Sequence, residues 1–293
     1  MRNRFTDELA ICGLNAVLAA GEYHPENINR LFLREDRLKQ FSGLCKNLAE
    51  RKRPYKICED EELEKICKSS HHQGVVAMIL LPALLPLSRE DLEEWAGEGK
   101  TGMVLHSVGN DHNLGAIARS AAFFDVKYIV ISENDSVPEL STSAYRTAEG
   151  GMEHVTVRTV RNTAAFLRDA SRLLLTIGTD TRARRRIGDL PRIVEEKQKA
   201  AGTLRAVGAS KTEAGASGAS KTEAGPQKTS ATTSKIAAGR PGIAVVLGNE
   251  ETGLPEDVKD ACSVMLRIPG TGIMESLNVA QTATLFMQKI FEL

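Results

Sequence analysis

The distribution of apolar residues along the chain predicts an α/β protein. Short runs that are apolar at nearly every position alternate with segments whose apolar residues recur at helical spacing. From residue 101 onward the apolar runs are 103–107, 127–132, 173–177, 243–247 and 264–268. Such runs are typical of strands in a parallel sheet that helices cover on both faces. We therefore expect residues 101–293 to form one parallel-sheet domain.

Residues 7–81 show a smaller pattern of the same kind. It predicts helices at 7–21, 36–51 and 61–67, and strands at 28–33, 55–58 and 74–81. We expect residues 1–82 to form a small α/β domain. Prolines and charges favour a linker over 83–100, with a short helix at 91–95.

Residues 197–240 differ in composition from both domains. They are mostly Ala, Gly, Ser, Thr and Lys, lack aromatic residues, and contain a duplication in which 208–215 recurs as 218–225. This composition cannot bury enough apolar surface to offset the entropy of ordering. We expect a disordered insertion, and a functional tether is the alternative.

Charge and cysteine content exclude some classes of protein. Lys and Arg together number 38, as do Asp and Glu, so the overall charge does not indicate a polyanion partner. The five cysteines form no CxxC pair, which favours reduced thiols and a cytoplasmic location. Cys58, Cys67, His71 and His72 do not have the spacing of a zinc site, so we expect no metal. The most apolar run, 75–87, contains two prolines and is too short to span a membrane.

A glycine loop near the C-terminus is the first candidate site. Gly270 and Gly272 follow the strand that ends at Ile268, and Ser276 and Asn278 then stand in the first turn of an apolar helix. These two side chains could cap the helix or belong to a polar ligand site. A dinucleotide fold is disfavoured because Glu275 occupies the third glycine position.

A predicted helix carries the second candidate segment, which contains Asn113 and Arg119. Leu114 and Ile117 are on its buried face, so Arg119 points elsewhere, toward the side of Gly115. An uncovered guanidinium offers five planar donors to an anion. On this segment alone, an ordinary surface arginine explains the pattern as well.

The third candidate segment follows the strand at 243–247. It contains Leu247, Gly248, Asn249 and Glu250, and then a Gly-Leu-Pro turn. Ligands of open parallel sheets bind beyond the carboxyl ends of the strands, where this segment and the glycine loop both fall. A tight strand-to-helix turn would also explain the glycines.

Together the three segments resemble the motifs of the SpoU/TrmH class of SPOUT RNA methyltransferases. The matching residues are Asn113-x-Gly115-x-x-x-Arg119, Leu247-Gly248-Asn249-Glu250-x-x-Gly253-Leu254, and Ile268-Pro269 with Glu275-Ser276-Leu277-Asn278-Val279. Residues 8–81, with His72-Gln73-Gly74-Val75, resemble the substrate-binding domain that precedes many of these enzymes. One departure is His112, where the family commonly has proline.

This resemblance implies a C-terminal trefoil-knotted SPOUT domain preceded by a small RNA-binding domain. It implies a homodimer that transfers a methyl group from S-adenosyl-L-methionine to a ribose 2′-hydroxyl of structured RNA. The accessory domain favours ribosomal over transfer RNA. The alternatives are a non-catalytic RNA-binding or assembly protein that keeps the knot and, more remotely, a nucleotide-dependent oxidoreductase.

The resemblance also implies roles for individual residues. The implied catalytic residues are Arg119, Asn113, Glu250, Ser276 and Asn278. The implied cofactor-binding residues are Thr179, Leu247, Gly248, Asn249, Ile268 and Leu277. We expect Arg119 to bind the phosphate beside the reacting ribose, held by Asn113 and Glu250, while Ser276 and Asn278 orient the hydroxyl or the cofactor.

A cluster of arginines gives local support for RNA binding. Arginines stand at 182, 184, 185, 186 and 192 with one acid, Asp189, among them. Such a cluster suits phosphate groups. A solvated loop is the alternative, because no aromatic residues interleave to stack on bases.

Overall fold

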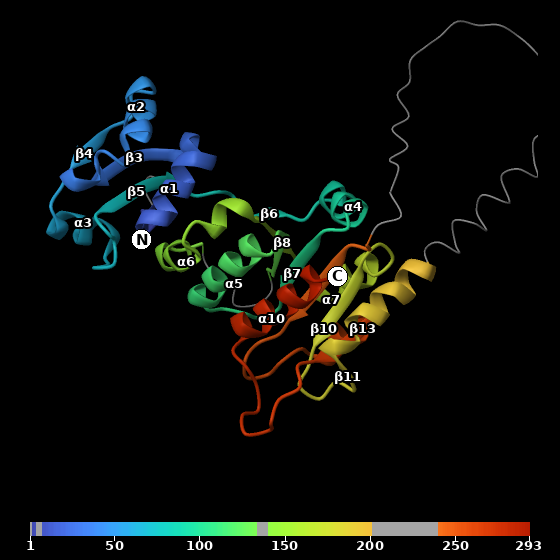
Figure 1. Cartoon of the computed structure of the whole chain (residues 1–293). Helices are drawn as coiled ribbons and strands as arrows, with labels where there is room; N and C mark the ends of the chain where they lie inside the picture. The colour runs from blue at the N-terminus through green and yellow to red at the C-terminus, as the bar shows by residue number, and fades with distance from the viewer. Residues whose placement is uncertain (1, 4–7, 134–139, 201–239) are drawn as a thin grey trace, which may run out of the picture.

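The computed structural model describes residues 2–3, 8–133, 140–200 and 240–293 (Figure 1). These residues form a smaller sheet near the N-terminus and a larger sheet built from the rest of the chain. The expected disordered insertion lies mostly in 201–239, outside the described residues.

The smaller sheet has the strand order β1-β2-β5-β3-β4. Its strands are β1 (Arg2–Asn3), β2 (Glu8–Cys12), β3 (Ile28–Leu33), β4 (Tyr55–Ile57) and β5 (Val75–Leu80). Its helices are α1 (Leu14–Tyr23), α2 (Ser42–Glu50) and α3 (Asp60–Cys67), and 3-10 turns lie at Pro25–Asn27 and Glu35–Arg37. The expected strands at 28–33, 55–58 and 74–81 are confirmed to within one or two residues.

The expected helix over 7–21 is wrong in its first part. Glu8–Cys12 is strand β2, which pairs antiparallel with β5. Leu9 and Ile11 are buried on one side of the sheet, while Ala10 and Cys12 are buried on the other. A strand buried on both faces shows no polar alternation, so its pattern cannot be told from that of a buried helix. Gly13, with φ of 100°, separates β2 from α1.

The larger sheet has the order β11-β13-β10-β12-β7-β8-β9-β6, and every pairing among its described strands is parallel. Its strands are β6 (Leu85–Pro86), β7 (Thr101–Leu105), β8 (Val126–Ser132), β9 (Thr156–Val160), β10 (Leu175–Thr179), β11 (Arg185–Arg186), β12 (Ile243–Leu247) and β13 (Val264–Arg267). Its helices are α4 (Arg89–Gly97), α5 (Asp111–Phe123), α6 (Thr142–Ala148), α7 (Thr163–Ala170), α9 (Glu256–Ala261) and α10 (Val279–Phe291), with a further helix over 190–200. Short 3-10 turns lie at Gly151–His154 and Ile187–Asp189.

Helices cover both faces of this sheet. Met103 and Leu105 of β7 pack into the core that includes α5, α6 and α10. Val104, between them, faces the opposite core, which α4, α7 and α9 complete. The prediction of an α/β protein with a covered parallel sheet is therefore confirmed. The trefoil knot stays a prediction.

The segment 83–100, which we expected to be a linker, is part of the larger sheet and its helical layer. Strand β6 pairs with β9, and α4 packs on the sheet through Trp95, which is fully buried. The indole nitrogen of Trp95 donates to the carbonyl oxygens of Lys100 and Ile243, at 3.1 and 3.2 Å. The Trp95 ring also stacks on Tyr128 with 5.1 Å between the ring centroids. The prolines that favoured a linker instead stand beside and within an edge strand, where a missing backbone donor is tolerated.

The smaller sheet is packed directly against the larger unit. Buried residues of β2 and α1 share one apolar cluster with those of α5 and α6. The hydroxyl of Thr142, at the start of α6, donates to the carbonyl oxygen of Ala10 in β2 at 2.6 Å. Tyr23 and His154 meet edge to face with 4.4 Å between ring centroids. Among the described helices, none has the length and apolar character needed to cross a membrane.

Candidate cofactor cavity and catalytic residues

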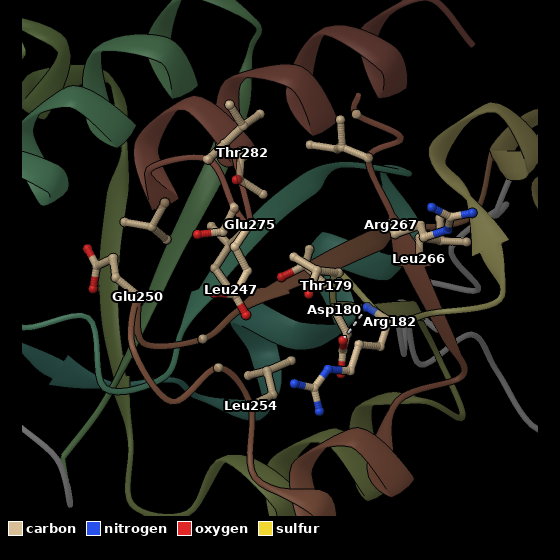
Figure 2. A pocket seen from close by; sticks show the side chains of 18 of the residues that line it. Thr179, Asp180, Arg182, Leu247, Glu250, Leu254, Leu266, Arg267, Glu275 and Thr282 are labelled. Atoms are coloured by element: carbon tan, nitrogen blue, oxygen red, sulfur yellow. Dashed lines mark hydrogen bonds between the residues drawn. The ribbon is translucent and has the colours of Figure 1, made fainter. Parts of the chain in front are cut away.

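A cavity of about 760 Å³ opens at the carboxyl ends of β10, β12 and β13 (Figure 2). Thr179 ends β10, Leu247 ends β12, and Leu266 and Arg267 end β13. Because the three strands are parallel neighbours, the loops that follow them leave the same edge of the sheet. This volume is typical of a site for a small molecule or cofactor.

Gly248 allows the loop after β12 to fold back on itself. A Cβ atom at this position would lie 2.6 Å from the Gly253 carbonyl oxygen and 2.7 Å from the Leu254 nitrogen. The backbone nitrogen of Gly253 donates to the carbonyl oxygen of Asn249 at 2.9 Å, which closes the turn. Only glycine fits where two backbone segments approach this closely.

All six residues expected to bind the cofactor line this cavity. They are Thr179, Leu247, Gly248, Asn249, Ile268 and Leu277. Two of their side chains are engaged in building the loops. Asn249 donates to the carbonyl oxygen of Ser107 at 3.0 Å and accepts from the backbone of Glu251 at 2.9 Å, and Thr179 donates to the carbonyl oxygen of Val246 at 3.1 Å. These two residues therefore shape the cavity, and their role in binding a cofactor stays a prediction.

Three of the expected catalytic residues form one hydrogen-bonded chain beside the cavity. The side-chain amide of Asn113 donates to the carboxylate of Glu250, which lines the cavity. The side-chain oxygen of Asn113 accepts from the amide of Asn278 at 3.2 Å. Asn113 comes from α5, Glu250 from the loop after β12, and Asn278 from the start of α10. Segments that are far apart in sequence thus meet through their polar side chains.

Asn278 caps α10 as well as taking part in this chain. Its side-chain oxygen accepts from the backbone nitrogen of Ala280 at 2.8 Å. The helix begins at Val279, so the expectation that Ser276 and Asn278 lie in its first turn is wrong. Ser276 instead lies in the preceding loop and lines the cavity. The two interpretations of Asn278, as a cap and as part of a polar site, are therefore compatible.

Arg119 has a different position from the one expected. It is not among the described residues that line the cavity, and its Nη1 pairs with Oε1 of Glu149 at 3.0 Å. Asn113 is six positions earlier on the same helix, so the two side chains are displaced by about 9 Å along the axis and point in different directions. We expected Asn113 and Glu250 to hold Arg119, but within one chain these two residues bond to each other and Arg119 pairs with Glu149, so this expectation is wrong. The Arg119 side chain is 59% exposed, as expected for an uncovered guanidinium.

Charged residues of both signs surround the cavity. In Figure 2, Glu250 lies on one side, and Arg182 and Arg267 lie on the other. Burial opposes ionisation of Asp180, but hydrogen bonds from the backbone of Arg182 and from Lys259 together lower the pKa of its carboxyl group. The Lys259 ammonium lies 2.9 Å from Asp180. Sequence analysis did not identify Asp180, Lys259 or Arg267 as lining residues, although Asp180 directly follows the observed end of β10, where ligand contacts gather.

The arginine cluster lies next to this cavity. Arg185 and Arg186 form β11, which pairs with the end of β13 at the edge of the sheet. Arg182 lines the cavity itself. Each of the five arginines at 182, 184, 185, 186 and 192 is exposed. The side chain of His112, the departure from the family pattern, lies between α5 and α6, within 3.1 Å of the Ser143 hydroxyl.

Comparison with known proteins agrees with this geometry. The chain is 28% identical over 284 residues to the 23S rRNA (guanosine-2'-O-)-methyltransferase RlmB of Nitrosomonas europaea, a match covering 96% of this chain and 90% of that protein. It is 26% identical over 283 residues to the tRNA/rRNA methyltransferase YfiF of Escherichia coli O157:H7, a protein described as uncharacterized, covering 96% and 67%.

Solved structures share the fold. The AviRb SpoU methyltransferase of Streptomyces viridochromogenes, in complex with the cofactor AdoMet, has a TM-score of 0.65 at 16% identity, covering 99% of this chain and 93% of that one. An rRNA methyltransferase of Sinorhizobium meliloti has a TM-score of 0.66 at 18% identity, covering 97% and 87%.

The family matches account for both sheets. Residues 10–82 match the domain described as RNA 2'-O ribose methyltransferase substrate binding. Residues 100–204 and 201–288 match the SpoU rRNA Methylase family. These ranges contain the three segments whose side chains meet at the cavity. The chain belongs to the SpoU rRNA Methylase family and carries its N-terminal substrate-binding domain.

Proposed function

We propose that this protein transfers a methyl group from S-adenosyl-L-methionine to a ribose 2′-hydroxyl of structured RNA, with ribosomal RNA as the favoured substrate. The observation that carries the proposal is the chain of hydrogen bonds through Glu250, Asn113 and Asn278. It joins residues of all three motifs beside a cavity of the right size for the cofactor. The RlmB relatives, named for 2′-O-methylation of 23S rRNA, support the same reaction, while the name of YfiF keeps transfer RNA as the alternative.

The cavity has the chemistry that this cofactor needs. Leu247, Leu254 and Phe286 give it apolar walls, which suit an adenine ring. Glu250 and Glu275 place carboxylates on its lining, which suit a positively charged sulfonium or amino group. The backbone of Leu247, Gly248, Ile268 and Leu277 would hold the cofactor, with Thr179 at the base of the site.

The remaining chemistry is alignment and charge stabilisation by the protein. When bound, the cofactor supplies an activated methyl group on a sulfonium. The ribose hydroxyl has to meet it in line and lose its proton, so holding the two groups in that geometry lowers the barrier. Asn113 and Asn278 keep the Glu250 loop against α10, and Ser276 is placed to orient the hydroxyl or the cofactor.

Arg119 would bind the phosphate next to the reacting ribose and stabilise negative charge that develops on its oxygen. A guanidinium is protonated at all accessible pH values, which makes it a positioning cation rather than a base. Because Arg119 does not line the cavity of its own chain, we further propose a homodimer in which it reaches the cavity of the second copy. The exposed rings of Phe123 and Phe291, at the ends of α5 and α10, support an apolar contact there.

RNA would contact the exposed arginines beside the cavity, and it would also contact the N-terminal domain. Contacts between arginines and phosphates release counterions, so RNA binding should weaken as salt is added. We place this activity in the cytoplasm, where the substrate RNA and reduced cysteines are both found.

Methyl-labelled S-adenosyl-L-methionine and total RNA test the proposal. We expect the protein to label RNA, and Arg119→Ala to reduce labelling by at least about 100-fold while cofactor affinity stays near normal. Arg89→Ala is the matched control, because Arg89 is an exposed arginine paired with a glutamate, Glu93, on α4.

Cofactor binding without any labelling of RNA would favour the non-catalytic alternative. Full turnover by Arg119→Ala would remove this arginine from the mechanism. Mapping 2′-O-methyl groups in RNA from cells that lack the protein would then distinguish ribosomal from transfer RNA.

A further inference from the structure

We propose that Glu149 is a positioning residue that connects the substrate-binding domain to Arg119. This inference rests on the proposed function and assigns to Glu149 a role in it. The carboxylate uses both oxygens: Oε1 lies 3.0 Å from Nη1 of Arg119, and Oε2 accepts from the side-chain amide of Asn15 at 3.2 Å. Asn15 belongs to α1 of the substrate-binding domain, and Arg119 belongs to α5, which covers one face of the larger sheet.

The contacts from Asn15 through Glu149 to Arg119 form a bridge, and the backbone around Glu149 fixes this bridge in place. Glu149 ends α6 in a left-handed conformation with φ of 45°, and Gly150 follows with φ of 92°. A Cβ atom at Gly150 would lie 2.8 Å from Cβ of Ala19 and 3.1 Å from the carbonyl oxygen of Asn15. Segment 149–151 is therefore pressed against α1 so closely that no side chain fits between them.

The same segment is pressed equally closely against α5. A Cβ atom at Gly151 would lie 2.8 Å from Cα of Arg119 and 2.8 Å from the carbonyl oxygen of Ala118. Segment 149–151 thus lies between α1 on one side and α5 on the other. A displacement of α1 would be transmitted to the backbone that carries Arg119, because packed interiors deform little.

The effect of Glu149 should be on orientation rather than on stability. An exposed pair of arginine and glutamate side chains contributes little to folding, and these two side chains are 59% and 43% exposed. A carboxylate that Asn15 already holds in one orientation offers the guanidinium a fixed partner. Arg119 is then preorganised at the side of α5, so less ordering remains when it binds phosphate.

Single-turnover kinetics with labelled cofactor and excess RNA test the bridge. Glu149→Gln keeps the length and shape of the side chain and removes its charge. We expect the rate of methyl transfer to fall by about tenfold, with cofactor and RNA affinities within about twofold of the original chain. Glu93→Gln is the matched control, since it breaks the exposed Arg89–Glu93 pair on α4 and should leave the rate unchanged.

A double-mutant cycle tests whether Asn15 and Glu149 affect the rate of methyl transfer through the same bridge or independently of each other. Asn15→Ala should also slow methyl transfer, and combining it with Glu149→Gln should produce no further slowing. Rates that fall by the product of the two single effects would overturn the inference, as would a Glu149→Gln variant with full activity.

The mobility of the Arg119 side chain gives a readout that does not need activity. NMR relaxation of its labelled Nε–H group should show larger motion in both Glu149→Gln and Asn15→Ala, and no change in Glu93→Gln. If the original chain transfers no methyl group, the proposed function fails, and this measurement alone decides on the bridge. Unchanged mobility in both variants would then rule the bridge out.

Discussion

At the scale of single residues, glycine positions shape the cavity as much as polar side chains do. Gly248 stands where the loop after β12 meets the backbone of Gly253 and Leu254. The loop that it closes carries Asn249 and Glu250, which line the cavity. A change at this one position would therefore move several lining residues together.

Gly248→Ala should weaken binding of S-adenosyl-L-methionine by about tenfold or more. The added methyl group would overlap backbone atoms, and displacing a packed segment costs on the order of 1–3 kcal/mol. Titration calorimetry measures the affinity directly. Gly188→Ala is the control, because a Cβ there meets none of the described residues within 4 Å and Gly188 does not line the cavity. Equal cofactor affinity in both variants would contradict this account of the loop.

Local patterns indicated that the two glycine loops form a candidate site, and the family resemblance implied which of their residues bind the cofactor. Neither predicted the partner of Arg119. Each expected cofactor residue except Thr179 stands at the end of an apolar run or in a loop with glycines. The apolar run or the glycines that mark such a residue are within a few positions of it in the sequence. Thr179 came from the family resemblance alone. The partner of Arg119 is Glu149, which directly follows α6, the helix after the next strand. Only packing of α5 against α6 brings them together, and no spacing in the sequence encodes that contact.

At the scale of elements, ion pairs help to attach α4 to the larger sheet: Asp91 pairs with Arg158 of β9, and Glu94 pairs with Lys127 of β8. The Nε atom of Arg158, in β9, lies 2.9 Å from the carboxylate of Asp91, whose side chain is only 15% exposed. Asp91 also accepts from the backbone nitrogen of Ser88 at 3.0 Å, which fixes the start of the helix. The hydrogen bond from Arg158 is the main reason that the pKa of Asp91 is lowered from its ordinary value of 3.8. The elements expected to be a linker are thus held by charge as well as by the burial of Trp95.

Asp91→Asn should destabilise the fold by about 1–3 kcal/mol at neutral pH, because it leaves the Arg158 guanidinium without its carboxylate. A lowered carboxyl pKa means that this stabilisation is present above the ordinary value and is lost as pH falls through the folded pKa, below 3.8. Urea unfolding at several pH values measures both effects. Glu93→Gln, on the same helix but exposed, should change stability by less than about 1 kcal/mol. A difference between Asp91→Asn and the original chain that persists unchanged in strong acid would contradict the argument.

The spacing of apolar residues predicted most helices and strands. It failed where a buried strand and a buried helix have the same apolar pattern. Glu8–Cys12 is buried on both faces, so it could be interpreted as the start of the helix that follows. Val279 begins α10 three residues later than Ser276, because the side chain of Asn278 caps the helix there. In both cases the boundary depends on a backbone conformation or a hydrogen bond that apolar spacing does not reveal.

At the scale of the whole molecule, the contact between the two sheets buries a carboxylic acid. The side chain of Glu153 is only 9% exposed, and its Oε2 lies 3.8 Å from Nε2 of His24 in the N-terminal domain. Burial raises the pKa of Glu153 above its ordinary value of 4.5, and the nearby His24 only partly offsets this. Sequence analysis could not predict this contact, because it depends on side chains from both units.

Glu153→Gln should stabilise the protein at neutral pH. A raised carboxyl pKa favours the folded state at low pH, and that contribution is lost as pH rises above 4.5 through the folded pKa. Removing the charge should therefore raise the melting temperature at pH 7 by about 2 °C, equivalent to roughly 1 kcal/mol. The gain should disappear as pH falls below 4.5. A lower melting temperature at pH 7 would mean that attraction to His24 outweighs burial.

The apolar cluster shared by β2, α1, α5 and α6 limits how this enzyme could be re-engineered. A chimaera that grafts a foreign substrate-binding module in place of residues 1–82 would remove the apolar side chains of β2 and α1 that share this cluster with α6. Thr142 would lose the acceptor that Ala10 provides. Exchange of the module would therefore require a matching redesign of α6, so changes of RNA target in such proteins should be accompanied by substitutions on that helix.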